Sequence, residues 1–195
     1  MSQEKKPLTD AEFDKILQAA IRKDAEGAGK RYPCRGGLDA RVVGETEAIV
    51  LFLRYTGMHV SILAEADRYN LHLEDDMIVW NRTKKQGKMA RTSIPIHKNI
   101  NFDIAAFIDD MKKRNRRISR QFFHTIIKGI GERAGVPGIS PMTFRHTLAV
   151  SMLNEGFQET LILQTLNCSR KVLATYGQYT DPLKKSAFQK LGWCN

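Results

Sequence analysis

The segment from Ser140 to Ser151, SPMTFRHTLAVS, constrains the fold more than any other part of the sequence. Serine is a favoured N-cap and proline a favoured first helical residue, so the segment predicts a helix that begins at Pro141. Phe144, Leu148 and Met152 recur at helical spacing, and this spacing predicts one buried apolar stripe.

Two polar side chains, Arg145 and His146, lie beside that stripe near the start of the predicted helix. Free backbone N–H groups and the helix dipole create positive potential at a helix N-terminus, so an arginine there is well placed to bind an anion. The alternative is an ordinary surface Arg-His pair on an amphipathic helix, because arginine is mostly solvated. The rest of the chain decides between the two.

The charge balance favours the anion. The 195 residues include 31 Lys and Arg against 21 Asp and Glu, which gives a formal charge of +10. A folded basic domain of this size favours a polyanionic partner, nucleic acid before membrane. No segment is long and apolar enough to span a membrane, and the N-terminus lacks the apolar core of a signal peptide. We therefore expect no membrane partner and a cytoplasmic or nucleoid-associated location.

Cofactor and metal sites are not predicted. Cys34, Cys168 and Cys194 are few, odd in number and far apart, so they indicate neither a disulfide framework nor a metal site. The glycine-rich segment at 27–37 lacks the Gly-Lys-Ser/Thr ending of a nucleotide-binding loop. Neither feature therefore predicts a metal or nucleotide site.

Hydrophobic periodicity predicts a mainly α-helical fold with one small antiparallel β-sheet, in a single domain over residues 1–195. The sheet is expected at about 68–96, with turns at 74–76 and 86–87, and a basic loop at 27–41. Helices are expected near residues 9–21, 45–55, 59–65, 102–113, 122–130, 140–152 and 158–166, and from Pro182 onward.

Cationic side chains gather in three further places: the β region, residues 112–120 and residues 170–171. The second of these holds six cations in nine residues without an acid. Such a run is most often a solvated surface, and it also fits a patch that contacts phosphates. The predicted DNA-binding residues are Lys85, Lys88, Arg91, Arg114, Arg116, Arg117, Arg120, Arg170 and Lys171.

Four short motifs, in order along the chain, resemble the catalytic domain of the tyrosine recombinases of the phage-integrase type. They are Thr56-Gly57-Met58-His59-Val60-Ser61, a lysine-bearing hairpin, Thr143-Phe144-Arg145-His146-Thr147-Leu148-Ala149, and Tyr179-Thr180. The third closely matches the family's Leu-Arg-His-Thr-Phe-Ala. The others are weak alone, but their order and separation make the combination specific. The resemblance extends from the first helix to Tyr179.

The resemblance implies a reaction on double-stranded DNA. In this family a tyrosine attacks a phosphodiester and forms a 3′-phosphotyrosyl link, so neither metal nor ATP is needed. Two arginines hold the nonbridging oxygens, a hairpin lysine protonates the leaving 5′-oxygen, and His or Trp side chains orient the phosphate. Tyr176 competes with Tyr179 as nucleophile, and Lys85 with Lys84 as the lysine. The predicted catalytic set is Tyr179, Arg145, Lys84, His59 and His146.

Three positions depart from the family pattern. His59 stands where the first arginine is expected, Met142 stands where a His or Lys is expected, and Leu166-Asn167-Cys168-Ser169 replaces Leu-Gly-His-Ser. Tyr179 also lies two residues beyond the family spacing. A protonated His59 would supply part of the missing positive charge, and Arg54 or Arg170 are alternatives. Two hypotheses follow. The first is a DNA strand transferase that these changes leave weak or, at the extreme, inactive. The second is a recombinase-derived module that only binds DNA.

The ends of the chain carry two more expectations. Family members usually have an N-terminal helical DNA-binding domain, whereas here the first catalytic-domain helix starts within ten residues of Met1, so we expect that domain to be absent. Leu183, Ala187 and Leu191 recur every four residues after Pro182 and predict a C-terminal helix. This helix docks on a neighbouring subunit of a homo-oligomer on DNA or packs on the chain's own core.

Overall fold

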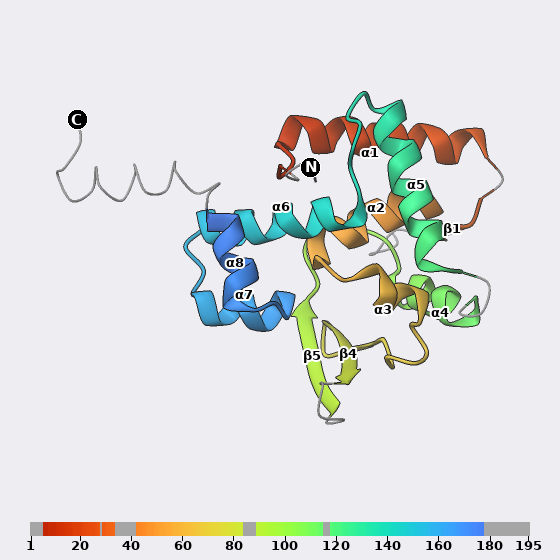
Figure 1. Ribbon diagram of the computed structural model, residues 1–195. Helices are drawn as coiled ribbons and strands as arrows, with labels where there is room; N and C mark the ends of the chain where they lie inside the picture. The colour runs from red at the N-terminus through yellow and green to blue at the C-terminus, as the bar shows by residue number, and fades with distance from the viewer. Residues whose placement is uncertain (1–5, 28, 34–41, 84–88, 115–117, 178–195) are drawn as a thin grey trace, which may run out of the picture.

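The chain folds into helices with small antiparallel β-sheets, which confirms the predicted fold class (Figure 1). The computed structural model describes residues 6–27, 29–33, 42–83, 89–114 and 118–177. Their helices are α1 (Asp10–Glu26), α2 (Glu45–Thr56), α3 (Val60–Ala64), α4 (Ile104–Lys113), α5 (Arg120–Arg133), α6 (Pro141–Asn154), α7 (Glu159–Leu166) and α8 (Arg170–Gly177). Their strands are β1 (Arg31–Pro33), β2 (Val42–Gly44), β3 (His72–Glu74), β4 (Met77–Thr83) and β5 (Met89–Pro95).

Capping residues fix where the first and sixth helices begin. Thr9 and Glu12 form a capping box on α1, in which the Thr9 N–H donates to Glu12 Oε2 at 2.8 Å. These hydrogen bonds lower the pKa of Glu12, since they stabilise its charged form. Ser140 caps α6 and Pro141 occupies its first turn, as the sequence predicts. The helix that carries Arg145 therefore has a fixed start.

The strands form two separate antiparallel sheets. The larger sheet has the order β3-β4-β5, within the predicted β region, and Trp80 pairs with Thr92 across it. The smaller sheet pairs β1 with β2, and Tyr32 lies opposite Val43. The prediction of a loop over 27–41 is therefore wrong for residues 31–33. A three-residue strand between glycines and arginines is too short to produce an alternation that stands out in the sequence.

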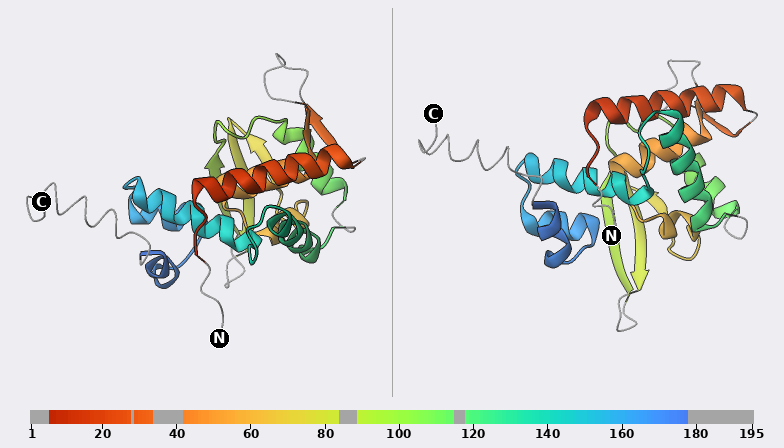
Figure 2. Two further views of the ribbon diagram at one scale, coloured as in Figure 1. Left: turned by 90° about the horizontal axis from the view of Figure 1, so that it is seen from above. Right: turned by 45° about the horizontal axis from the view of Figure 1, so that its top comes forward.

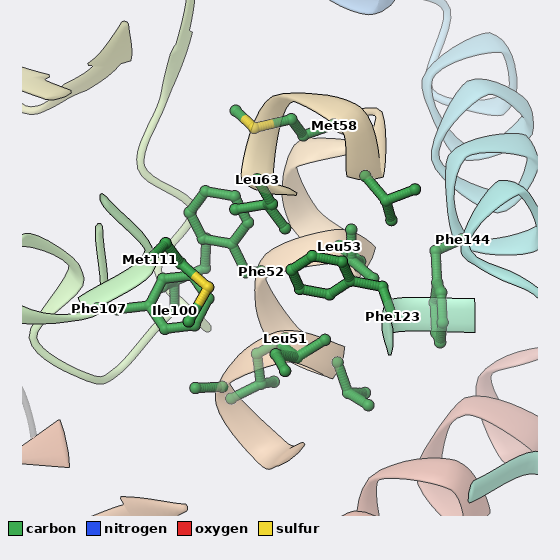
Figure 3. Packing of buried hydrophobic residues seen from close by; sticks show 14 of the residues in the cluster. Leu51, Phe52, Leu53, Met58, Leu63, Ile100, Phe107, Met111, Phe123 and Phe144 are labelled. Atoms are coloured by element: carbon green, nitrogen blue, oxygen red, sulfur yellow. The ribbon is translucent and has the colours of Figure 1, made fainter. Parts of the chain in front are cut away.

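The main hydrophobic core surrounds α2, and Figure 3 shows its side chains from close by. Phe52 and Leu53 on α2 are fully buried. Phe107 comes from α4 on one side, and Phe123 on α5 and Phe144 on α6 come from the other. The rings of Phe52 and Phe107 lie 5.2 Å apart. Helix α2 is thus the central element of this core.

A second, smaller core lies between α6, α7 and α8, which gather at one end of α6 (Figure 2). Helix α6 contributes Phe144 to the main core and Met152 to the second one. Leu148 between them is only half-buried and packs on the second core. The predicted single stripe is therefore divided, because α6 connects two packing units and buries different faces along its length.

A buried polar network fastens β1 to α2 and α4. The Asp110 carboxylate accepts from the Tyr32 hydroxyl at 3.1 Å and from Arg114 at 3.1 Å, and it pairs with Lys30. Arg114 also pairs with Glu45 at 2.5 Å. Burial raises the pKa of Tyr32 to about 12, so the phenol stays protonated as donor. The network fixes the small sheet to the helical core.

None of the helices among the described residues has both the length and the apolar character needed to cross a membrane.

We expect Asp110→Asn to destabilise the fold by about 2 kcal/mol, because it removes the one charge that three donors share. The value lies below the roughly 3–5 kcal/mol of a fully buried broken pair, since the Lys30 side chain is 53% exposed. Urea denaturation measures it. Asp109→Asn is the matched control, because Asp109 is the neighbouring exposed carboxylate on the same helix. Equal midpoints for the two variants would contradict the role of the network.

Candidate active site

A cavity of about 490 Å³ lies where the α2–α3 turn meets β4, α6 and the end of α7. Its polar lining includes His59, Arg68, Trp80, Arg145 and Asn167. These residues come from five separate parts of the chain, so the folded structure alone brings them together. Two guanidinium groups and an imidazole facing one hollow make it suited to an anion.

The Thr56-Gly57 motif makes the turn at the edge of this cavity. Gly57 has φ +57°, the left-handed conformation that ends α2. A Cβ at this position would lie 2.8 Å from Leu166 and 3.0 Å from Leu148. The Thr56 hydroxyl donates to the Phe52 carbonyl at 2.6 Å and accepts from the Met58 N–H at 3.1 Å. Glycine is therefore required both for the backbone conformation and for the close approach of α6 and α7.

Arg145 connects this turn to the end of α7. Its Nη1 donates to the Gly57 carbonyl at 2.9 Å, and its Nη2 donates to the Leu166 carbonyl. The guanidinium is partly buried and lines the cavity. Both acceptors are neutral carbonyls, so these bonds orient the positive charge without cancelling it.

His59 lies on the opposite side of the same turn as the N-cap of α3. Its Nδ1 accepts from the Ser61 N–H and lies 2.9 Å from the Ser61 hydroxyl. The ring is exposed and lines the cavity together with Arg145. Two of the residues predicted to be catalytic therefore share one hollow.

The two arginines suggested as substitutes for the missing first arginine lie elsewhere. Arg54 is 9% exposed and packs over the rings of Phe13 and Tyr55, at 5.5 Å from each centroid. It lines a different cavity, on the α1 side of α2. Arg170 pairs with Glu159 at 3.2 Å. Neither lines the cavity of Arg145.

Sequence reasoning missed Arg68 and Trp80. Arg68 follows α3 in a turn and its guanidinium pairs with Glu65 at 2.6 Å. Trp80 lies on β4, is 3% exposed, and its Nε1 has no hydrogen-bond partner among the described residues. Neither belongs to a motif, and only the folding of the sheet against the α2–α3 turn brings them to the cavity.

Tyr176 lies next to this site but is enclosed. Its side chain is 2% exposed, its ring lies 4.8 Å from that of His146, and its hydroxyl has no hydrogen-bond partner of good geometry within the described part of the chain. Burial raises the pKa of Tyr176, and the nearby Arg145 charge offsets part of that rise. A phenol so enclosed has to move before it can attack a phosphate.

The altered Leu-Asn-Cys-Ser segment keeps the backbone shape that glycine would give. Asn167 ends α7 at φ +49°, a left-handed conformation that asparagine adopts more easily than most residues. Cys168 packs against the second core. Burial raises the pKa of its thiol, and the Arg145 charge lowers it in part. The substitutions thus change hydrogen bonding at the site more than they change the path of the chain.

The predicted DNA-binding cations are mostly engaged with acids where the structure describes them. Arg91 pairs with Glu74, Arg120 with Glu65 and Arg170 with Glu159, all on the surface. Arg114 differs from the prediction, since its side chain is only 23% exposed and belongs to the Asp110 network. Lys171 is exposed. The residues predicted for the site that lie outside the described residues are Lys84, Lys85, Lys88, Arg116, Arg117 and Tyr179.

Comparisons with known proteins agree on one family. The sequence pattern of the Phage integrase family matches residues 41–185. A tyrosine recombinase XerC of Roseiflexus sp. (strain RS-1) is 27% identical over 167 residues, which cover 76% of this chain and 51% of that protein. The chain therefore spans about half the length of this relative.

Solved structures show the same fold. The crystal structure of XerA recombinase matches with a TM-score of 0.62 at 22% identity, and the match covers 97% of this chain and 65% of XerA. The XerH site-specific recombinase, in a post-cleavage complex with its palindromic difH substrate, matches with a TM-score of 0.59 at 15% identity. That match covers 94% of this chain and 53% of XerH.

We expect Arg145→Gln to raise the pKa of the Cys168 thiol further, because the guanidinium is the charge that favours the thiolate. The pH profile of alkylation by iodoacetamide, measured with Cys34 and Cys194 replaced by serine, should then shift its midpoint to higher pH. The control is Arg170→Gln, which removes a cation two residues from Cys168 that pairs with Glu159. An unmoved midpoint in Arg145→Gln would show that the two groups are not neighbours.

Proposed function

The chain belongs to the phage integrase family, and we propose that it is a tyrosine recombinase that cuts and rejoins double-stranded DNA through a 3′-phosphotyrosyl intermediate. The observation that supports this most directly is the shared cavity of Arg145 and His59 at the Gly57 turn. A cationic hollow of this kind suits a single backbone phosphate. The family membership adds the reaction for which such a hollow is used.

The proposed reaction conserves the number of phosphate ester bonds. The Tyr179 phenol gives its proton to solvent as its oxygen attacks phosphorus and forms the phosphotyrosyl ester, while the bond from phosphorus to the 5′-oxygen breaks. A hairpin lysine, Lys84 or Lys85, gives its proton to that leaving oxygen. A 5′-hydroxyl of another strand then attacks the ester and releases the tyrosine. The chemistry needs no metal or cofactor.

Arg145 has the clearest role in this scheme. Its guanidinium is oriented by two backbone carbonyls and lines the cavity, so it is held in place before the phosphate arrives. Preorganised donors of this kind stabilise negative charge that builds on the nonbridging oxygens. His59 would add a hydrogen bond, and charge when protonated. The His146 ring lies against the Tyr176 ring, and we propose that His146 supports the wall of the site.

Double-stranded DNA is the proposed partner, and the net charge of +10 supports it. XerH, which shares the fold, is described in complex with its difH substrate. We further propose that residues 1–195 act as one catalytic domain, with Lys85, Lys88, Arg91, Arg116, Arg117, Arg120, Arg170 and Lys171 on DNA phosphates. A homo-oligomer on DNA, held by the segment from Pro182 to Asn195, completes the proposal. Its place in the cell would be the cytoplasm or the nucleoid.

We expect a covalent protein–DNA adduct with nicked suicide duplexes, from which the cleaved fragment diffuses away. A pool with a randomised central sequence avoids the need to know the target site. Tyr179→Phe should abolish the adduct, because it removes the attacking oxygen, and denaturing gel electrophoresis detects this. Tyr176→Phe should retain it, because that hydroxyl is enclosed.

Retention of the adduct in Tyr179→Phe and its loss in Tyr176→Phe would transfer the nucleophile to Tyr176. Absence of any adduct from the native chain, with DNA binding intact, would instead favour the module that only binds DNA. Binding alone decides nothing, since both hypotheses predict DNA affinity that falls steeply with salt.

The hairpin lysine can be identified with a 5′-thio leaving group. A thiolate, with a pKa of about 8.5, leaves without a proton, whereas an alkoxide does not. The variant that removes the general acid, Lys84→Ala or Lys85→Ala, should cleave ordinary DNA slowly, by a factor of about 10²–10⁴, and recover on the 5′-thio substrate. Arg145→Ala should not recover, because its effect falls on the nonbridging oxygens. Equal recovery in all three variants would refute a general-acid role.

A further inference from the structure

The cavity contains a second guanidinium whose position has no counterpart in the motifs of the sequence. Arg68 lines the same hollow as Arg145 and His59. It lies nine residues beyond His59, after α3, and its side chain is 71% exposed. A long, exposed side chain that lines this cavity is able to turn toward a ligand that enters it.

Arg145 alone is a limited donor for a phosphate with two charged nonbridging oxygens. One N–H on each of its two terminal nitrogens is already committed to a backbone carbonyl, at Gly57 and at Leu166. An arginine has five N–H donors in total, so these two bonds reduce what remains for a ligand. His59 contributes one imidazole. The transition state therefore calls for a further cationic donor in the cavity.

Arg68 can move from its present partner to a phosphate at little cost in free energy. Its described partner is Glu65, at 2.6 Å, in an exposed pair of neighbouring turns. Exposed ion pairs contribute little to stability, so Arg68 can exchange its carboxylate for a phosphate. Glu65 also binds Arg120 at 3.1 Å through its other carboxylate oxygen. The Glu65 side chain is 26% exposed, so water solvates its charge when the arginines turn to DNA.

Trp80 lies beside the same hollow and lines it. Its Nε1–H lacks a partner among the described residues, which is uncommon for a buried donor. The Nε1 atom is itself buried, so a ligand oxygen reaches it only when neighbouring side chains move. Trp80 therefore serves as a reporter of the cavity.

We propose that Arg68 is a catalytic residue that binds the scissile phosphate together with Arg145. It would supply the guanidinium that the family carries at position 59, from a different point of the backbone. This inference rests on the proposed function, since it assigns a residue to the same reaction. Glu65 holds Arg68 at the cavity until DNA binds.

The test compares Arg68→Ala with Arg133→Ala in single-turnover cleavage of the suicide duplexes. Arg133 is a matched control, because it also forms an exposed surface pair, with Glu26 at 2.8 Å, and lies outside the cavity. Arg68→Ala should slow adduct formation by a factor of about 10²–10³, the usual effect of removing one transition-state donor. Arg133→Ala should stay within about threefold of the native rate, as for an ordinary surface substitution. DNA affinity should fall in Arg68→Ala, which removes a phosphate contact, and stay close to the native value in Arg133→Ala, which removes none.

A second measurement does not require cleavage. Inorganic phosphate is titrated against the fluorescence of Trp80, in a chain with Trp193→Phe so that Trp80 is the only indole. The signal should saturate in the native chain and in Arg133→Ala. In Arg68→Ala the midpoint should rise by about tenfold, since a charged hydrogen bond to the anion is lost.

The outcomes separate the two proposals. A native chain that forms no adduct overturns the proposed function, and the phosphate titration then still decides whether Arg68 belongs to an anion site. A native chain that cleaves, together with Arg68→Ala cleaving at the rate of Arg133→Ala, overturns this inference and leaves the proposed function intact. The inference also fails if phosphate gives no saturable signal, or if both arginine variants titrate alike.

Discussion

The site depends on the pair of hydrogen bonds from Arg145 to the carbonyls of Gly57 and Leu166. They join α6 to the end of α2 and to the end of α7. Glycine suits residue 57 because its φ is +57°, and a Cβ there would also lie within 3.0 Å of the Leu166 and Leu148 side chains. One glycine and one arginine, 88 residues apart, thus define the cavity together.

This arrangement also explains why α6 is buried on several faces. Phe144 packs in the main core and Met152 in the second, so the helix acts as a rod between two hydrophobic units. The Arg145 side chain projects from α6 near the N-terminal end of the helix, beside the junction of the two hydrophobic cores. Because Ser140 caps the start of α6, the backbone at Arg145 is fixed, and this helps to hold the guanidinium in place.

Much of the fold could be predicted from the sequence, because its signals are local. The Ser140-Pro141 start, the capping box at Thr9 and the glycine at 57 each act within one helical turn, and each is found where it was expected. The strand at 31–33 was missed because it and its partner, 42–44, are only three residues long. Local patterns also made Arg114 look like a surface cation. Its two acid partners, Glu45 and Asp110, include one that lies 69 residues away, so no local pattern could reveal its burial.

The residues of the candidate site also fall into two groups: those that local sequence patterns reveal and those that only the fold brings together. Motif matching found Arg145 and His59, because both belong to short stretches of fixed spacing. It could not find Arg68 or Trp80, whose nearness to Arg145 follows from the packing of β4 and the α3 turn. A phosphate responds to charge and donors at a point in space, and it does not register the backbone position that supplies them. For that reason, histidine at position 59 is weak grounds for inferring lost chemistry while a second guanidinium faces the same hollow. Counting each altered position in the sequence as a separate loss of catalytic rate overstates the total loss. Donors in one shared site act as a unit, and their effects on the rate do not add.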